Sequence, residues 1–216
     1  GCIDPTATNY DPLANTNDGS CIGGLSIGDT YQGGIVFYLD GNGGGLIAAP
    51  THQISGKQWG CYQVDISGAD GIAIGTGNQN TIDIEAGCTA PGIAADICAN
   101  LTLGGYGDWF LPSKDELNLM YLNIGQGNAL GLGNIGGFSP NTYWNSTEHN
   151  IEAAWKQHFN TGYQGVNHKS WSLHVRAVRA FSFPIIDTTN TVMVSTSGWN
   201  YVTVTDSLGC TATDSV

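Results

Sequence analysis

YQGGIVFYLDGNGGGLIAA, residues 31–49, is the stretch that decides the fold of the central part of this chain. Gly33–Leu39 is rich in β-branched and aromatic residues and predicts a strand. Asp40–Gly43 predicts a tight turn, and Leu46–Ala49 then returns as a second strand. The stretch therefore predicts a β-hairpin.

Beyond this hairpin the sequence predicts two helices among loops and further strands. Ile93–Leu101 carries apolar residues at helical spacing, and Ser113–Asn123 opens with a capping box of Ser113 and Glu116. Residues 59–87 are rich in Gly, Asn and Asp and predict long irregular loops. Short aromatic segments in the last part of the domain predict strands again. A mixed α+β domain follows.

The two ends of the chain differ from its centre. Residues 1–22 form an Asp-rich loop bounded by Cys2 and Cys21, and a disulfide closing this loop would contribute roughly 3 kcal/mol. Residues 184–216 alternate polar and apolar residues like strands of an immunoglobulin-like sandwich, but they are too few to complete a fold of about 100 residues. We therefore expect three parts, 1–22, 23–183 and 184–216, in a mature piece of a larger protein.

Cysteine usage indicates an oxidising compartment. None of the cysteines belongs to a C-x-x-C pair of the zinc or redox kind, so disulfides are the better interpretation and the expected location is extracellular, at a cell surface. Cys2 with Cys21 is the expected N-terminal bond. Three pairings are open among Cys61, Cys88, Cys98 and Cys210. Of these we favour Cys88 with Cys98, which leaves Cys61 and Cys210 free or bonded to each other.

The charge balance excludes two classes of partner. The chain has 18 acidic and six basic residues, a net charge of −12, which argues against nucleic acid and anionic lipid. The sequence contains no run of about 20 apolar residues, so we expect no membrane insertion.

Five phrases, in order, carry a resemblance to a known family. They are YQGGIVFYLD, GGYGDWFLPSKDELNLMY, TYWNSTE, AAWKQHF and VRAVRAF. Over residues 25–182 the chain resembles the C-terminal domain family named after a bacterial collagen-like adhesin. The resemblance implies a C-type-lectin-like fold with long loops, surface attachment and, as in the founding member, binding of sulfated glycans. Residues 1–21 resemble a short Asp-rich repeat of secreted bacterial proteins, and the tail resembles part of an immunoglobulin-like repeat of gliding-bacterium adhesins.

The expected ligand site lies between residues 141 and 179, where three of the six tryptophans and four of the six basic residues are found. Aromatic faces stack on sugar rings, and cations there would attract a polyanionic glycan. Trp144 and Trp155 read more readily as core, and Arg176 and Arg179 as members of structural ion pairs. The predicted ligand-binding residues are Asn145, Glu148, Tyr163, Asn167, His168, Lys169 and Trp171.

Calcium is the one cofactor that the sequence suggests. A hard cation takes six to eight oxygen ligands, and the first 22 residues supply carboxylates and amides in a loop without regular structure. The alternative is that the same side chains only stabilise turns. The predicted ligands are Asp4, Asn9, Asp11, Asn15, Asn17 and Asp18. A weaker second site is expected around Asp65, Asp70 and Asp83.

The sequence favours a binding module over an enzyme. It contains no G-x-S-x-G elbow, HExxH helix or P-loop. The first hypothesis is an adhesin that binds a surface glycan or a protein ligand. The alternative is a structural subunit of an extracellular fibre, in which copies of the chain assemble through the terminal β segment.

Overall fold

The computed structural model describes residues 1–3, 7, 10–11, 13–16, 24–41 and 43–182, and the backbone of 201–205 and 211–215. By their contacts the residues divide into two compact units, Gly1–Ile185 and Ile186–Val216. The boundaries expected at 22/23 and 183/184 stay a prediction. Within the described part of the chain, no helix has the length and apolar character needed to span a membrane.

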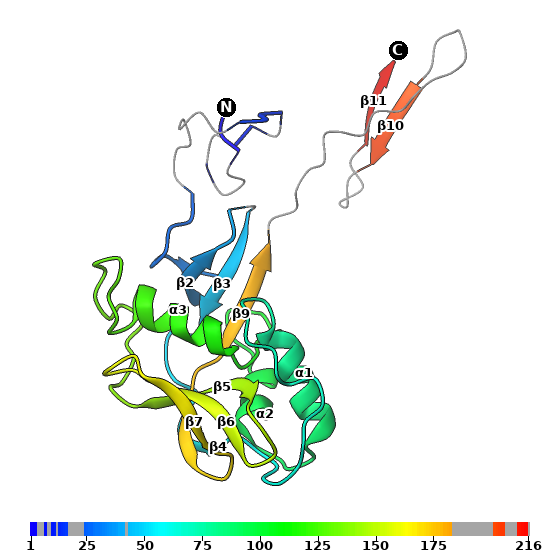
Figure 1. The fold of residues 1–216 in the computed structure, drawn as a ribbon. Coiled ribbons are helices and arrows are strands. Elements are labelled where there is room, and N and C mark those ends of the chain that lie inside the picture. Colours follow the sequence, from blue (N-terminus) through cyan, green and yellow to red (C-terminus); the bar gives the residue numbers. More distant parts are fainter. Residues whose placement is uncertain are drawn as a thin grey trace. The chain divides into compact units, whose positions relative to one another are not determined.

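The predicted hairpin is confirmed and lies inside a four-stranded antiparallel sheet (Figure 1). The sheet has the order β1-β2-β3-β9. Its strands are β1 (Thr30–Tyr31), β2 (Gly34–Leu39), β3 (Gly44–Ala48) and β9 (Val178–Ser182). The strand β9 at the end of the domain therefore pairs with the β2–β3 hairpin at the beginning of the domain, and this pairing joins the two ends of the domain in one sheet.

The hairpin is buried on both faces. Val36 and Ile47 enter one apolar cluster, whereas Phe37, Leu46 and Ala48 enter a second. Because successive strand residues point to opposite faces, a strand buried on both sides reads as a continuous apolar run. This burial explains why the deciding stretch shows no polar alternation.

A second sheet of five strands has the order β4-β8-β5-β6-β7. Its strands are β4 (Ile54–Gln58), β5 (Thr142–Glu148), β6 (Ala153–His158), β7 (Gln164–His168) and β8 (Ser172–Val175). The pair β5–β8 is parallel, and the other neighbours are antiparallel. The β6–β7 pair forms one edge of this sheet.

Three helices accompany the sheets: α1 (Gly77–Gly87), α2 (Ala94–Ala99) and α3 (Lys114–Ile124). The predicted capping box of α3 is confirmed, because the Ser113 hydroxyl accepts from the Glu116 N–H and the Glu116 carboxylate accepts from the Ser113 N–H at 2.7 Å. Glu116 is buried and also accepts from the Gly75 N–H at 2.8 Å. Burial raises the pKa of the Glu116 carboxyl although these hydrogen bonds oppose the shift.

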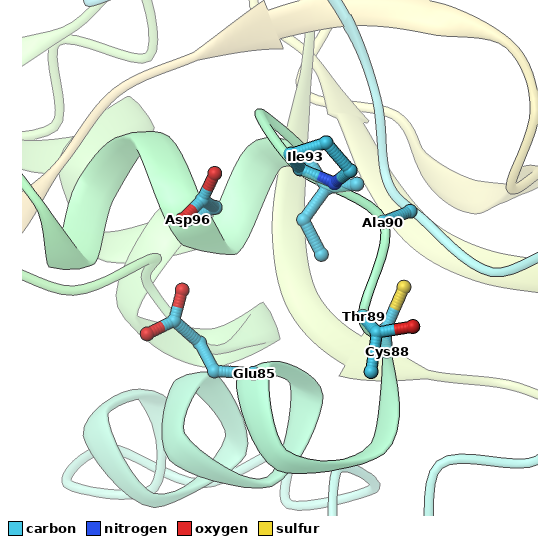
Figure 2. Close-up of a pocket in the computed structure, with 7 residues that line it drawn as sticks. Glu85, Cys88, Thr89, Ala90, Ile93 and Asp96 are labelled. Atoms are coloured by element: carbon cyan, nitrogen blue, oxygen red, sulfur yellow. The ribbon is translucent and has the colours of Figure 1, made fainter.

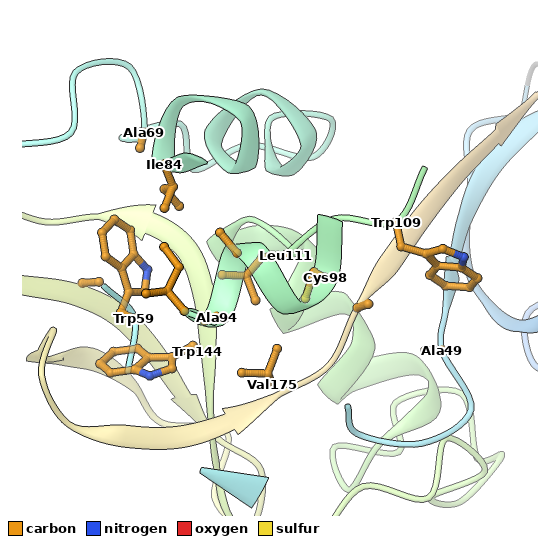
Figure 3. Packing of buried hydrophobic residues seen from close by; sticks show 14 of the residues in the cluster. Ala49, Trp59, Ala69, Ile84, Ala94, Cys98, Trp109, Leu111, Trp144 and Val175 are labelled. Carbon is orange, nitrogen blue, oxygen red and sulfur yellow. The ribbon is translucent and has the colours of Figure 1, made fainter. Parts of the chain in front are cut away.

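Tryptophans fill the larger apolar cluster. Trp59 and Trp144 lie fully buried beside Ile84 of α1 and Ala94 of α2, and Figure 3 shows both indole rings in this packing. Each indole N–H is satisfied: that of Trp59 donates to the Asn145 carbonyl at 2.8 Å, and that of Trp144 donates to the Lys57 carbonyl at 2.9 Å. The interpretation of Trp144 as core is confirmed.

Arg176 is fully buried and joins two segments far apart in the sequence. Its guanidinium donates to the Ala49 carbonyl at 2.5 Å and to the Gly136 carbonyl at 2.9 Å, and it lies 4.1 Å from the Phe138 ring centroid. Burial lowers the pKa of Arg176 to about 10. Arg176 thus has the expected structural role, but its partners are main-chain carbonyls.

The predicted α+β, C-type-lectin-like fold class is wrong. The described residues of the first unit are mainly β, with sheets of four and five strands and three helices of 11, six and 11 residues. The helices predicted at 93–101 and 113–123 are present as α2 and α3, but the strands of the two sheets hold more of the described residues than the three helices do. The loop prediction for residues 59–87 also missed α1, whose buried face carries Gly77, Asn80 and Thr81 and so gives little apolar periodicity.

The favoured disulfide Cys88–Cys98 is also wrong. Cys88 bonds Cys61, with an S–S distance of 1.99 Å and a Cα–Cα distance of 5.6 Å. Cys98 is a free thiol on the buried side of α2, where it packs as a small apolar residue, and burial raises the pKa of this thiol. Cys2 is disulfide-bonded. Cys21 and Cys210 lie outside the described residues.

The C-terminal unit contains one described hairpin. Strands β10 (Tyr201–Thr205) and β11 (Thr211–Ser215) pair antiparallel as a two-stranded sheet. The strand predicted from the alternation in Tyr201–Thr205 is confirmed, whereas the one predicted at 191–194 lies outside the described residues.

Candidate binding surface

The β6–β7 pair carries one face on which apolar and aromatic side chains gather. Trp155 of β6 stands directly opposite Val166 of β7, and Ala153 stands opposite His168. Because strand residues two apart share a face, Val166 and His168 point to the same side as Trp155. Val166 is 41% exposed and Trp155 is half-buried.

Tyr62 extends this face from a different segment. Its ring stacks on the His168 ring with a centroid distance of 3.9 Å and an interplanar angle of 34°. The neighbouring disulfide at Cys61 holds the segment of Tyr62, while the His168 ring bonds the Ser170 hydroxyl at 2.6 Å. Both rings are therefore held by local bonds.

The tight turn directly after β7 carries another exposed aromatic residue. The Trp171 N–H donates to the His168 carbonyl at 2.9 Å, and the Trp171 side chain is 59% exposed. We call Tyr62, Trp155, Val166, His168 and Trp171 the aromatic surface.

A hollow of about 280 Å³ lies next to the aromatic surface. His149 belongs to both features, because it lines the hollow and packs edge-on against Trp155 at 5.6 Å. The hollow is lined mainly by polar groups: Asp65, Ser67, Asp70, Glu148, His149 and Asn150, with Ile66 and Gly68. It offers carboxylate and amide oxygens beside exposed rings.

Two of the predicted ligand residues form a buried ion pair beneath this region. Lys169 is fully buried and pairs with Glu148. The Lys169 ammonium also donates to the Val64 carbonyl at 2.8 Å and lies 4.8 Å from the Trp59 ring centroid. The Glu148 carboxylate accepts from the Ile66 N–H at 3.0 Å. Lys169 is therefore out of reach of a ligand, whereas Glu148, 7% exposed, lines the hollow, and the pair fixes the 64–66 segment.

The other predicted ligand residues occupy different places. Asn145 is fully buried, and its side-chain oxygen accepts from the Thr147 N–H at 3.0 Å. Tyr163 is 63% exposed, with the Lys156 ammonium 5.1 Å from its ring centroid. By strand alternation, Asn167 and Lys156 point away from the aromatic surface. Of the seven predicted residues, His168 and Trp171 belong to this surface.

The expected basic region is not a cationic surface. Lys169, Arg176 and Arg179 are all buried. Arg179 bonds the Asp108 carboxylate and the Gln32 side-chain oxygen, and its guanidinium stacks 3.8 Å from the Tyr106 ring centroid. Arg176 and Arg179 thus have structural roles, as weighed from the sequence, although Arg176 bonds carbonyls and not a carboxylate.

The N-terminal calcium site is described in part. The Asp11 carboxylate accepts from the Leu13 N–H at 3.0 Å, and the Asn15 side-chain oxygen accepts from the Thr16 hydroxyl at 2.9 Å. Both side chains act in local turns, which is the alternative that the sequence left open. The remaining predicted ligands lie outside the described residues: Asp4, Asn9, Asn17 and Asp18.

The weaker second metal site is not assembled. Asp65 and Asp70 line the same hollow, whereas Asp83 in α1 accepts from the Gln79 amide at 2.9 Å and does not line it. Across the described ranges, no three acidic, histidine or cysteine side chains gather closely enough to hold a metal ion.

Another hollow, of about 330 Å³, lies between α1 and α2 and carries Glu85 and Asp96 (Figure 2). The Asp96 carboxylate accepts from the Gly92 N–H at 2.5 Å and from the Asn100 amide at 2.7 Å. Burial, and secondarily the charge of Asp96, raises the pKa of Glu85. Since the Asp96 carboxylate already bonds groups of its own loop and helix, we assign it a structural role and propose no ligand for this hollow.

Sequence reasoning missed three members of the aromatic surface: Tyr62, Trp155 and Val166. Tyr62 lies in a stretch without periodicity, and its neighbour Cys61 was the only signal of a fixed position. Trp155 was predicted to lie in the core, but it is half-buried, with the Lys114 ammonium of α3 4.4 Å from its ring centroid.

The family model described as the Lcl C-terminal domain matches residues 55–179, which include the whole aromatic surface and both partners of the Cys61–Cys88 bond. The comparison with curated proteins gives no match. The flanking repeats expected at the two ends stay predictions. The match covers more than half of the chain, which therefore belongs to the Lcl C-terminal domain family of bacterial surface-associated proteins.

Proposed function

We propose that this chain is an extracellular binding module of a bacterial surface protein and that it binds a glycan on the aromatic surface. The observation that carries the proposal is the Tyr62–His168 ring stack with the exposed Trp171 in the adjoining turn. Exposed rings gathered on one face mark binding sites, and flat rings match the apolar faces of sugars.

The fixed positions of these rings favour binding. The Cys61–Cys88 bond holds one side of the surface, and the Glu148–Lys169 pair holds the segments beneath it. A surface ordered before binding loses less conformational entropy when the ligand docks. Rings that are already fixed therefore allow a higher affinity for the same contact area.

The hollow beside the rings supplies hydrogen-bonding groups. Asp65 and Asp70 are exposed, and Asn150 lines the same space. Carboxylate oxygens accept from sugar hydroxyls, and an amide can both donate and accept. A ring stack flanked by such groups suits a saccharide better than a purely apolar ligand.

A non-catalytic role is part of the proposal. Two of the groups with shifted pKa values have clear structural partners: Glu116 caps a helix, and Arg176 bonds two carbonyls. Cys98 packs inside the core. Perturbed groups often mark active sites, but structural networks perturb them as well.

The alternative is a subunit of an extracellular fibre. One observation favours it: among the described residues of the C-terminal unit, β10 and β11 form a sheet of two strands, and a two-stranded hairpin is marginally stable by itself. Strand addition by a neighbouring copy would complete such a sheet. Self-association measured by analytical ultracentrifugation, and lost when residues 201–216 are removed, would favour the fibre.

Calcium remains a proposed cofactor for residues 1–22. Isothermal titration calorimetry with calcium, repeated on the variant Asp11→Asn, tests it. Saturable heat that falls in the variant supports the site, and a titration without heat removes it.

The binding proposal is tested on a glycan array with the wild-type chain and two matched variants. Trp171→Ala removes an exposed ring from the aromatic surface, and Tyr163→Ala removes a similarly exposed ring elsewhere. We expect Trp171→Ala to weaken binding at least about tenfold, equivalent to about 1.4 kcal/mol, and Tyr163→Ala to bind like wild type. A blank array, or equal losses in both variants, would contradict the proposed site.

A further inference from the structure

We infer that the aromatic surface takes an uncharged glycan and rejects sulfated ones. The inference rests on the proposed function and adds the ligand class. It departs from the resemblance, which implied sulfated glycans as ligands. The reason lies in where the six basic side chains are, all of which fall within the described residues.

Half of the cations are withdrawn from the surface. Lys169 is neutralised by Glu148, Arg179 bonds Asp108, and Arg176 is enclosed by main-chain carbonyls. Lys169 and Arg176 are fully buried and cannot reach a sulfate group without breaking the structure around them. Arg179, 8% exposed, lines a different hollow with Asp108 and Gln32, which shares no residue with the aromatic surface.

The remaining three lysines are dispersed. Lys57 of β4 lies near Gly92, and Lys156 stacks on Tyr163 on the side of β6 opposite Trp155. Lys114 alone reaches the aromatic surface, where its ammonium lies 4.4 Å from the Trp155 ring centroid. A sulfated chain carries closely spaced charges and needs several cations in a row, which this surface lacks.

Carboxylates surround the same rings. Asp65 and Asp70 are exposed in the hollow beside His149. Glu152 is exposed in the turn before β6, and its carbonyl accepts from the Lys169 N–H at 2.9 Å. One lysine against three carboxylates leaves a negative field, which repels sulfate but leaves uncharged hydroxyl groups free to bond the same oxygens.

The experiment uses a glycan array of neutral and sulfated oligosaccharides, followed by biolayer interferometry. Each neutral glycan that binds is compared with the chemically sulfated form of the same glycan at 20 mM and 150 mM NaCl. We expect the sulfated form to bind at least tenfold more weakly, with a larger deficit at the lower salt concentration because screening is weaker there. The neutral form should be insensitive to salt.

A charge variant with a matched control tests the cause. Glu152→Lys changes the net charge by two units beside the aromatic surface. The double variant Leu130→Lys/Leu132→Lys makes the same change in the exposed loop after α3. We expect Glu152→Lys to reduce the ratio of neutral-glycan affinity to sulfated-glycan affinity at least threefold, and the double variant to leave this ratio unchanged.

The outcomes separate the inference from the function it rests on. Sulfated glycans that bind as well as or better than their neutral forms would overturn the inference while the glycan-binding function stands. Binding of neither form would overturn both. Equal effects of the two charge variants would assign the discrimination to net charge and overturn the role given to the surface.

Discussion

Replacing Lys169 by Met removes one partner of the Glu148–Lys169 pair while keeping the unbranched apolar stem of the side chain. The carboxylate of Glu148, 7% exposed, is then left with the Ile66 N–H as its described donor, and the Val64 carbonyl loses its 2.8 Å bond. Breaking a buried pair in this way costs about 3–5 kcal/mol. We therefore expect the free energy of unfolding to fall by about 4 kcal/mol and the melting temperature by about 10 °C.

Urea denaturation followed by tryptophan fluorescence measures the loss, because Trp59 lies against the Lys169 ammonium. The matched control is Lys156→Met, which removes a half-buried lysine from the Tyr163 ring and should cost less than about 1 kcal/mol. The double variant Lys169→Met/Glu148→Leu should be less unstable than the two single losses added together. A Lys169→Met protein within about 1 kcal/mol of wild type would refute the structural role of the pair.

Three further predictions concern other parts of the domain. Reducing the Cys61–Cys88 bond, which closes a loop of 27 residues, should lower the free energy of unfolding by about 3.5 kcal/mol in urea titrations with and without reductant, and an unchanged midpoint would contradict this. Arg176→Lys should lower the free energy of unfolding by about 1–3 kcal/mol and speed hydrogen exchange in the loop after α3, because an ammonium cannot bond two separated carbonyls as a planar guanidinium does. Unaltered hydrogen exchange would contradict the role of Arg176 in joining Ala49 to Gly136. Burial, and secondarily His52, whose ring centroid lies 5.2 Å away, lowers the pKa of His174. The unfolded chain therefore binds the proton more readily, and the free energy of unfolding should fall as the pH drops below about 6.5. In NMR titrations His52→Asn should bring the His174 pKa closer to its ordinary value, and an unchanged pKa would contradict the effect of His52.

Local signals in the sequence predicted the elements that depend on near neighbours. The β2–β3 hairpin and the capping box of Ser113 and Glu116 were both found, because turn residues and caps act over four or five positions. The helix α1 was missed because Asn80 on its buried face bonds the Gly71 main chain and so presents a polar residue to the interior. A polar group that is buried and satisfied leaves no trace in an apolar pattern.

The candidate site was harder to predict because its residues are joined over long separations. Lys169 bonds Val64, 105 positions earlier, and Tyr62 meets His168 across a similar span. Nothing in the local sequence distinguishes a buried, paired lysine from an exposed one, so the lysine was assigned to the ligand. The same limit applies to Cys88, whose partner depends on which loop folds back to it.

The anchors beneath the aromatic surface bond main-chain atoms of residues 64–71. The Lys169 ammonium donates to the Val64 carbonyl, and the Glu148 carboxylate accepts from the Ile66 N–H. The Asn80 side chain accepts from the Gly71 N–H and donates to the Gly71 carbonyl. Every residue presents the same carbonyl, and every residue except proline presents the same amide N–H, so the side chain at an exposed position such as Val64 can change without loss of these bonds. A randomised library at exposed positions of residues 62–70, built on an unchanged Lys169 and Glu148, should retain the fold in most members while it diversifies what the surface recognises.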